Sequence, residues 1–89
     1  MLDSNAWAGG YELDLVLRRG RRLVFCEVKA KGGDGYGDPL EMVGREKLRR
    51  LVQAAQMWLA ARPDCGGLEV RFDAVGISER RLRRVTLVL

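Results

Sequence analysis

Four charged side chains lie inside two short apolar runs of this chain, where carboxylates are unusual. Glu12 and Asp14 belong to the first run, and Glu27 and Lys29 belong to the second. Carboxylate oxygens are the ligands that Mg²⁺ prefers in proteins, and a divalent cation would offset the repulsion between neighbouring carboxylates. The residue types therefore indicate a candidate site for a divalent cation, with a lysine beside it.

Both runs have the alternating pattern of β-strands. Apolar and polar residues alternate over 11–18 and again over 22–30. Arg19-Gly20 is a plausible two-residue turn between them, because glycine readily supplies the positive φ that such turns need. We therefore expect a β-hairpin in which Arg18 faces Arg21.

This hairpin register predicts how the carboxylates meet. It sets Asp14 opposite Phe25 and Glu12 opposite Glu27, so that Asp14 and Glu27 are diagonal neighbours with α-carbons roughly 7–8 Å apart. Carboxylates on such a diagonal can converge on one cation. We expect Glu12, Asp14 and Glu27 to share one face of the hairpin, with Lys29 next along it.

Two interpretations of these carboxylates stay open. In one, they lie on a solvated sheet face, where Lys29 neutralises part of their charge. In the other, they form a metal or catalytic site. The same face carries Val16, Leu23 and Phe25, which indicates a half-buried face rather than a solvated one.

Size and composition limit the class of protein. A chain of 89 residues with 47% apolar residues is expected to form a single domain over 1–89. Its apolar runs fall far short of the roughly 18 residues of a membrane span, and its first residues lack a signal-peptide pattern. We expect a cytoplasmic protein without a membrane partner. Two isolated cysteines and no histidine argue against a structural zinc site.

The rest of the chain predicts one helix and two further strands. A glycine-rich loop over 31–44 leads to a helical apolar stripe over 45–62, which Pro63 ends. Strands are expected over 68–77 and 84–89. The fold class is therefore α/β, in β-β-α-β-β order, with a central mixed sheet and the long helix packed on one face.

Basic residues exceed acidic ones, 16 against 12, for a net charge of +4. They cluster at 18–22, 45–50 and 80–84, and this balance suits a polyanionic partner such as nucleic acid, with DNA favoured. The alternative is that the clusters are simply solvated faces. Candidate contacts to nucleic acid gather at the start of the helix and in the preceding loop: Arg45, Lys47, Arg49, Arg50 and Lys31.

The order of these residues resembles known families. Asp14 followed by Glu27-Val28-Lys29 resembles the PD-(D/E)xK nuclease signature. The wider run, from about residue 2 to 77, resembles the YraN-like proteins, an uncharacterised family grouped with Holliday-junction-resolvase-like nucleases. The matching residues are Glu12 to Leu15, Leu23 to Lys29, Gly37 to Pro39 with Glu41, Lys47 with Ala54 and Ala55, and Val70 to Asp73.

The resemblance implies a restriction-endonuclease-like core and a metal-dependent endonuclease that hydrolyses phosphodiester bonds of DNA or structured nucleic acid. Asp14 and Glu27 would hold Mg²⁺ or Mn²⁺, and Lys29 would orient the attacking water or stabilise developing charge. Glu12 would be a third ligand or would support the other two. The alternative is a nucleic-acid-binding module that keeps the nuclease fold with weak or no catalysis. A protein-interaction domain is a third interpretation.

The chain is short at both ends relative to the family, which usually has a helix with an acidic residue before the first strand. Without that helix we expect the face of Val16, Leu23 and Phe25 to be open, and open apolar faces favour association. This predicts a homodimer, through that face or through an edge strand. The alternative is a monomer in which Leu2 and Trp7 fold back over the gap.

Two further residues have roles that the sequence leaves open. Trp58 lies on the apolar stripe of the helix, and we expect it in the core rather than stacked on a base. Asp73 lies within a predicted strand, and we favour a local structural hydrogen bond over support of the metal site.

Overall fold

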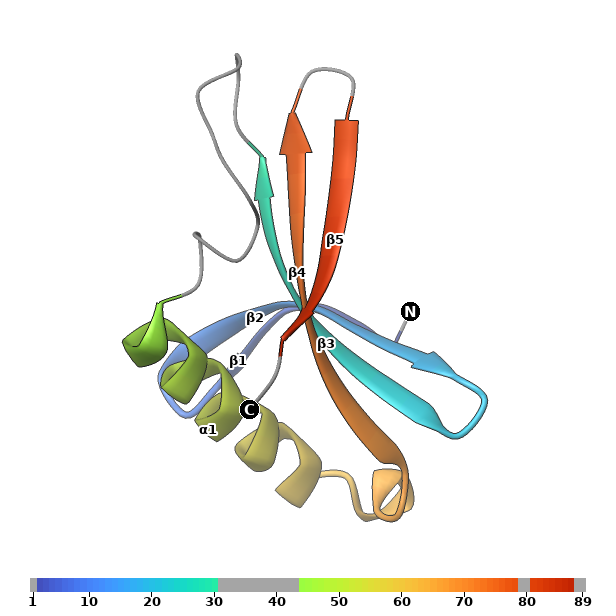
Figure 1. Ribbon diagram of the computed structural model, residues 1–89. Helices are drawn as coiled ribbons and strands as arrows, with labels where there is room; N and C mark the ends of the chain where they lie inside the picture. The colour runs from blue at the N-terminus through green and yellow to red at the C-terminus, as the bar shows by residue number, and fades with distance from the viewer. Residues whose placement is uncertain (1, 31–43, 79–80, 88–89) are drawn as a thin grey trace.

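The computed structural model describes residues 2–30, 44–78 and 81–87 (Figure 1). One helix and a five-stranded sheet make up this part of the chain. The elements are β1 (Asp3–Ala8), β2 (Tyr11–Arg19), β3 (Arg22–Ala30), α1 (Arg45–Ala60), the short 3-10 helix η2 (Pro63–Cys65), β4 (Glu69–Ser78) and β5 (Arg81–Leu87).

The sheet is mixed and follows chain order, β1-β2-β3-β4-β5. Neighbouring strands are antiparallel except β3 and β4, which are parallel. A parallel pair needs a long crossover, and α1 lies on the crossover between these two strands. Figure 1 shows α1 running along one side of the strongly twisted sheet. The predicted α/β class, with a mixed sheet and one long helix, is confirmed.

The predicted element order was wrong at its start, because β1 precedes the hairpin and the order is β-β-β-α-β-β. β1 has little apolar alternation, and its Trp7 is 72% exposed. It is held as a strand by backbone pairing with β2, from Asp3↔Val16 to Ala8↔Tyr11. An edge strand of this kind leaves a weak periodic signal in the sequence.

The core lies between α1 and the sheet. Phe25 is its centre, with the ring of Trp58 edge-on and the ring of Phe72 stacked, each with centroids 5.6 Å away. Burying one such aromatic side chain contributes about 1.5–3 kcal/mol. The prediction that Trp58 is a core residue is confirmed. The core also includes Leu13, Val16, Leu23, Leu51, Ala54 and Ala55.

The face of Val16, Leu23 and Phe25 is covered, not open as expected. All three side chains are fully buried in the cluster that α1 completes. The expectation failed because α1, which follows the hairpin in sequence, packs over this face. The homodimer therefore stays a prediction, and the apolar face from which it was inferred is covered by α1. Leu2 and Trp7 do not cover this core, since both are exposed.

The hairpin turn lies one residue later than predicted. Arg19 pairs with Arg22, so Gly20 and Arg21 form the two-residue turn, and Gly20 has a φ of 61°. Val16 therefore faces Phe25, and the predicted pairing of Asp14 with Phe25 is wrong. Of the two turn residues only Gly20 has a positive φ, as in a type II′ turn, which places glycine at its first central position, whereas the prediction placed it at the second.

A kink crosses β1 and β2 at the level of Asp14. Leu13 and Val16 are three residues apart and both fully buried, so the two-residue alternation of β2 shifts between them. Across from the kink, Asn5 has a positive φ of 50°. Consequently Tyr11 and Leu13 lie on the helix side of the sheet, although simple alternation from Val16 would place them on the other side.

The helices in the described part of the chain are too short and too polar to cross a membrane.

Candidate functional site

Asp14 lies where the β2–β3 ladder ends. The Cα pairing of the two strands runs from Arg19↔Arg22 to Leu15↔Cys26. Just beyond it, Oδ2 of Asp14 accepts a hydrogen bond of 2.9 Å from the backbone N–H of Val28. The side chain thus satisfies a donor that the ladder no longer pairs, and it holds its carboxylate next to the Glu27–Val28 peptide.

Glu27 is the second carboxylate, and residues from two other elements contact it. The phenol of Tyr11 donates a hydrogen bond of 2.6 Å to Oε2 of Glu27. Nζ of Lys47, from the first turn of α1, lies 3.4 Å from Oε1. Although ionisable, Glu27 is only 8% exposed. The site is therefore built from β2, β3 and the start of α1.

The surroundings of Glu27 disfavour the ionised form of its carboxyl group. Burial raises the pKa of the Glu27 carboxyl, and the negative charge of Asp14 raises it further. The hydrogen bond from Tyr11 and the charge of Lys47 act in the opposite direction without cancelling the effect of burial. Glu27 therefore favours a proton or another positive charge on its oxygens.

Tyr11 is suited to act as a permanent donor. Burial raises its pKa, and the hydrogen bond to Glu27 and the charge of that carboxylate raise it further. The phenol therefore stays protonated across the physiological range and orients Oε2 of Glu27.

Glu12 does not join Asp14 and Glu27 in this arrangement. It pairs with Trp7 of β1, and its neighbours Tyr11 and Leu13 lie on the helix side, so Glu12 faces the other way. The predicted pairing of Glu12 opposite Glu27 is wrong, because the register differs and the kink reverses the face. Within residues 2–30, 44–78 and 81–87, no three Asp, Glu, Cys or His side chains gather as a metal site.

Lys29 follows Glu27 by two residues and is exposed. Alternation along β3 places it on the same side as Glu27, at the outer end of the candidate site. Its predicted catalytic role stays a prediction. The lysine that contacts Glu27 is Lys47, which the sequence suggested as a nucleic-acid contact.

The other predicted nucleic-acid contacts on α1 are partly neutralised. Arg49 and Arg50 form ion pairs with Glu46, at 2.7 and 3.4 Å. Arg45 is exposed at the first position of the helix. Lys31 lies outside the described residues.

Sequence reasoning missed Tyr11 as a member of the site. Simple alternation places Tyr11 on the face opposite Asp14 and Glu27, and only the kink brings its hydroxyl to Glu27. The signal that could have found the kink is the pair Leu13 and Val16, two strongly apolar residues spaced by three around Asp14.

Asp73 has the structural role that we favoured. The side chain is fully buried, and its Oδ2 accepts a hydrogen bond of 2.6 Å from Nε of Arg84. Asp73 pairs with Cys26 in the parallel ladder of β3 and β4, on the sheet face opposite that of Phe25. It is therefore separate from the Asp14 and Glu27 cluster.

The sequence of this chain is similar to that of known proteins of one family. The model of the uncharacterised protein family UPF0102 matches residues 1–77. A UPF0102 protein of Vibrio campbellii is 39% identical over 79 residues, covering 88% of this chain and 65% of that protein. UPF0102 proteins of Frankia casuarinae and Xanthomonas oryzae are 44% identical over 78 residues and 46% identical over 74 residues. These matches cover 88% and 83% of this chain, and 65% and 61% of the relatives.

The chain thus spans slightly less than two thirds of the length of these relatives. The matched region includes every residue of the candidate site, from Tyr11 to Lys47. With the family model matching most of its length, the chain belongs to the uncharacterised protein family UPF0102.

Proposed function

We propose that this chain carries the site of a metal-dependent endonuclease of the PD-(D/E)xK type, which hydrolyses phosphodiester bonds of DNA or structured nucleic acid. The observation that supports the proposal is the meeting of Asp14 and Glu27 at the end of the β2–β3 ladder. The order of Asp14, Glu27 and Lys29 in the sequence matches the signature of that superfamily. A restriction-endonuclease-like core is part of the same proposal.

The residues present fit a magnesium or manganese ion. Mg²⁺ is commonly bound by one or two carboxylates together with water and substrate phosphate, so Asp14 and Glu27 would suffice as protein ligands. The raised pKa of Glu27 favours positive charge at this position. When bound, the ion would polarise the scissile phosphate and lower the pKa of a water molecule.

The chain's own residues would position these groups. The backbone N–H of Val28 fixes the Asp14 carboxylate, and the hydroxyl of Tyr11 fixes the Glu27 carboxylate. Lys29 and Lys47 would supply positive charge near the phosphate. Nζ of Lys47 lies 3.4 Å from Oε1 of Glu27, so the lysine would compete with a metal ion for this oxygen.

The first test is calorimetric titration of Mn²⁺ into the 89-residue chain and into the double variant Asp14→Asn, Glu27→Gln. We expect micromolar-to-millimolar binding that the double variant loses. Glu46→Gln is a suitable control, because it removes one exposed carboxylate of α1 outside the site. Lack of binding by the wild-type chain, or equal binding by the double variant, would contradict the metal site.

The second test is cleavage of branched and linear DNA with Mn²⁺, with EDTA as the control. Cleavage that depends on the metal and disappears in the Asp14→Asn, Glu27→Gln variant is the expected result. Metal binding without cleavage of any nucleic acid would contradict the nuclease proposal.

One observation favours a second candidate, a nucleic-acid-binding module without catalysis. Both oxygens of Glu27 already have partners, since Tyr11 contacts Oε2 and Lys47 contacts Oε1. A carboxylate engaged in this way is a weaker ligand. This candidate predicts binding of nucleic acid that is equal with Mn²⁺ and with EDTA, and no cleavage.

A further inference from the structure

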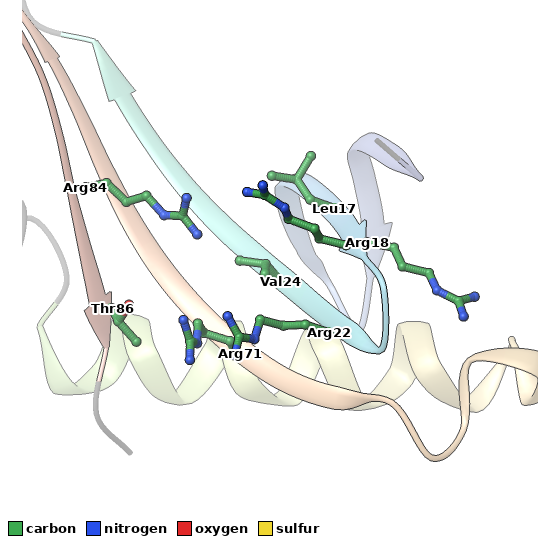
Figure 2. Close-up of a pocket in the computed structure, with 8 residues that line it drawn as sticks. Leu17, Arg18, Arg22, Val24, Arg71, Arg84 and Thr86 are labelled. Atoms are coloured by element: carbon green, nitrogen blue, oxygen red, sulfur yellow. The ribbon is translucent and has the colours of Figure 1, made fainter.

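A groove of about 610 Å³ lies on the sheet face opposite α1 (Figure 2). Its floor is apolar and includes Leu17 and Val24, which pair across β2 and β3. Arginines from four neighbouring strands surround this floor. They are Arg18 and Arg19 of β2, Arg22 of β3, Arg71 of β4 and Arg84 of β5.

The groove has five arginines, but only two of them form an ion pair with a carboxylate of the described residues. Arg22 lies 3.7 Å from Glu69, and Arg84 lies 2.6 Å from Asp73. The remaining three arginines of the groove form no ion pair with a described carboxylate. These are Arg18, Arg19 and Arg71.

Two of these arginines lie close together on neighbouring strands. Arg71 pairs with Val24, and Arg22 precedes Val24 by two residues, so Arg22 and Arg71 are diagonal neighbours on adjacent strands. Long side chains at such diagonal positions can reach each other, so Arg22 and Arg71 can contact the same anion.

Arg84 is held in place by a buried partner. Its Nε donates to the fully buried Asp73, while the side chain remains 52% exposed. A guanidinium has further N–H donors in a fixed planar fork, which are then free to bind an anion. Figure 2 shows Arg84 reaching from β5 over the sheet face toward the groove. The other oxygen of Asp73, Oδ1, has no hydrogen-bond partner among the described residues.

The basic residues of α1 offer less available charge. Arg49 and Arg50 share Glu46, and Lys47 contacts Glu27. Among the described residues, three arginines of the groove thus have no ion-pair partner, against one basic residue of α1, Arg45.

We infer that this groove binds the phosphodiester backbone of a nucleic acid, through contacts of the arginine guanidinium groups to phosphate oxygens. The planar fork of arginine matches phosphate with two parallel hydrogen bonds. Contacts of this type position a nucleic acid without reading its sequence. The inference takes its class of partner from the proposed function, but it does not depend on the metal site.

The test is fluorescence anisotropy with a labelled 20-base-pair DNA duplex in EDTA, measured over a series of salt concentrations. The test variant is Arg19→Ala, Arg71→Ala, which removes two charges without breaking an ion pair. The matched control is Gln53→Glu, Gln56→Glu, at two exposed positions of α1, which lowers the net charge equally, from +4 to +2. Circular dichroism verifies that both variants are folded.

We expect the test variant to reduce the slope of log affinity against log salt by about 1.8, and the affinity at 0.1 M salt by about 60-fold. The control should change both much less. The variant Arg19→Lys, Arg71→Lys keeps the charge, so it should keep the slope while losing part of the affinity. The same measurement with an RNA duplex tells DNA and RNA apart as sources of the phosphate backbone.

Three results would overturn the inference. They are no binding by the wild-type chain, unchanged binding by the test variant, and equal losses in the test and control variants. The variant Asp14→Asn, Glu27→Gln should bind the duplex in EDTA at least as well as the wild-type chain. The experiments therefore distinguish a failure of the proposed metal site from a failure of the proposed nucleic-acid contact in the groove.

Discussion

The hydroxyl of Tyr11 donates a 2.6 Å hydrogen bond to the buried Glu27, across two strands and sixteen positions of sequence. This contact exists because β2 kinks at Asp14 and turns Tyr11 to the helix side of the sheet. It links the first strand of the hairpin to the residue with the most perturbed carboxyl group of the candidate site.

Replacing Tyr11 by Phe should raise the pKa of Glu27 further, because the hydrogen bond from the hydroxyl favours the ionised carboxylate. We also expect a loss of about 1–2 kcal/mol in the free energy of unfolding. Carboxyl-detected NMR titration and urea denaturation measure the two effects. Trp7→Phe, a change of an exposed aromatic residue, is the control. An unchanged pKa of Glu27 would contradict the contact.

Glu27 should make stability fall as pH rises. Its pKa in the folded chain lies above the ordinary value of 4.5, so folding favours the protonated form. This contribution is fully present below pH 4.5 and is lost as pH rises through the folded pKa of Glu27. Glu27→Gln should flatten this part of the profile and raise the melting temperature at neutral pH. The measurement is thermal unfolding at a series of pH values, and a steeper decline in the variant would oppose this account.

Metal binding should release a proton in the same pH range. The ion and the proton compete for Glu27, so the apparent affinity for Mn²⁺ should increase with pH until Glu27 is ionised in the free chain. Calorimetry in buffers of different ionisation enthalpy measures the number of protons released. A pH-independent affinity would show that Glu27 is not a ligand.

Removing Arg84 should destabilise the fold more than removing another arginine of the groove. Arg84→Ala leaves the fully buried Asp73 without a counter-charge, and we expect a cost of about 3 kcal/mol. Arg19→Ala, at an exposed position of β2, should cost less than about 0.5 kcal/mol. Adding Asp73→Asn to Arg84→Ala should restore part of the loss. Urea denaturation of the wild-type chain, Arg84→Ala, Asp73→Asn and the double variant, with Arg19→Ala as the control, tests this, and additive losses would argue against the pair.

Asn5 should tolerate glycine but not valine. Its φ of 50° suits glycine and asparagine, whereas a β-branched side chain is strained in this region. We expect Asn5→Val to cost about 1–2 kcal/mol and Asn5→Gly to be close to neutral. Ser4→Val, at a neighbouring exposed position of the same strand, controls for the added apolar surface. Equal stability of Asn5→Val and Asn5→Gly would remove the case for the kink.

The helix and the hairpin could be predicted because their signals are local. The three-and-four spacing from Leu48 to Leu59 and the alternation of 22–30 each recur over several residues, and burial selects such patterns strongly. The pairing of Asp14 and Glu27 as neighbours on the hairpin also followed from alternation and turn position. The turn lies one residue later than predicted, which shifts the strand pairing by two residues and so changes the partners but keeps the faces of β3.

The remaining features depend on tertiary structure. β1 is a strand because it pairs with β2, and the position of Glu12 depends on a kink that includes a positive φ at position 5 of the neighbouring strand. The arginine groove joins residues of β2, β3, β4 and β5 that lie far apart in sequence. Arg71 and Arg84 come together with Arg19 only through the parallel pairing of β3 with β4, which local patterns do not specify.

That parallel pairing has a consequence for how the chain folds. It begins at Arg22↔Glu69 and ends at Ala30↔Ile77, so it needs the closure of a long intervening segment. Contacts of high sequence separation slow folding, whereas the meander of β1, β2 and β3 has only short connections. We therefore expect the meander to form early and β4 with β5 to dock late. Asp14, Glu27 and Tyr11 all belong to the meander, so the carboxylate pair can assemble before the arginine groove exists.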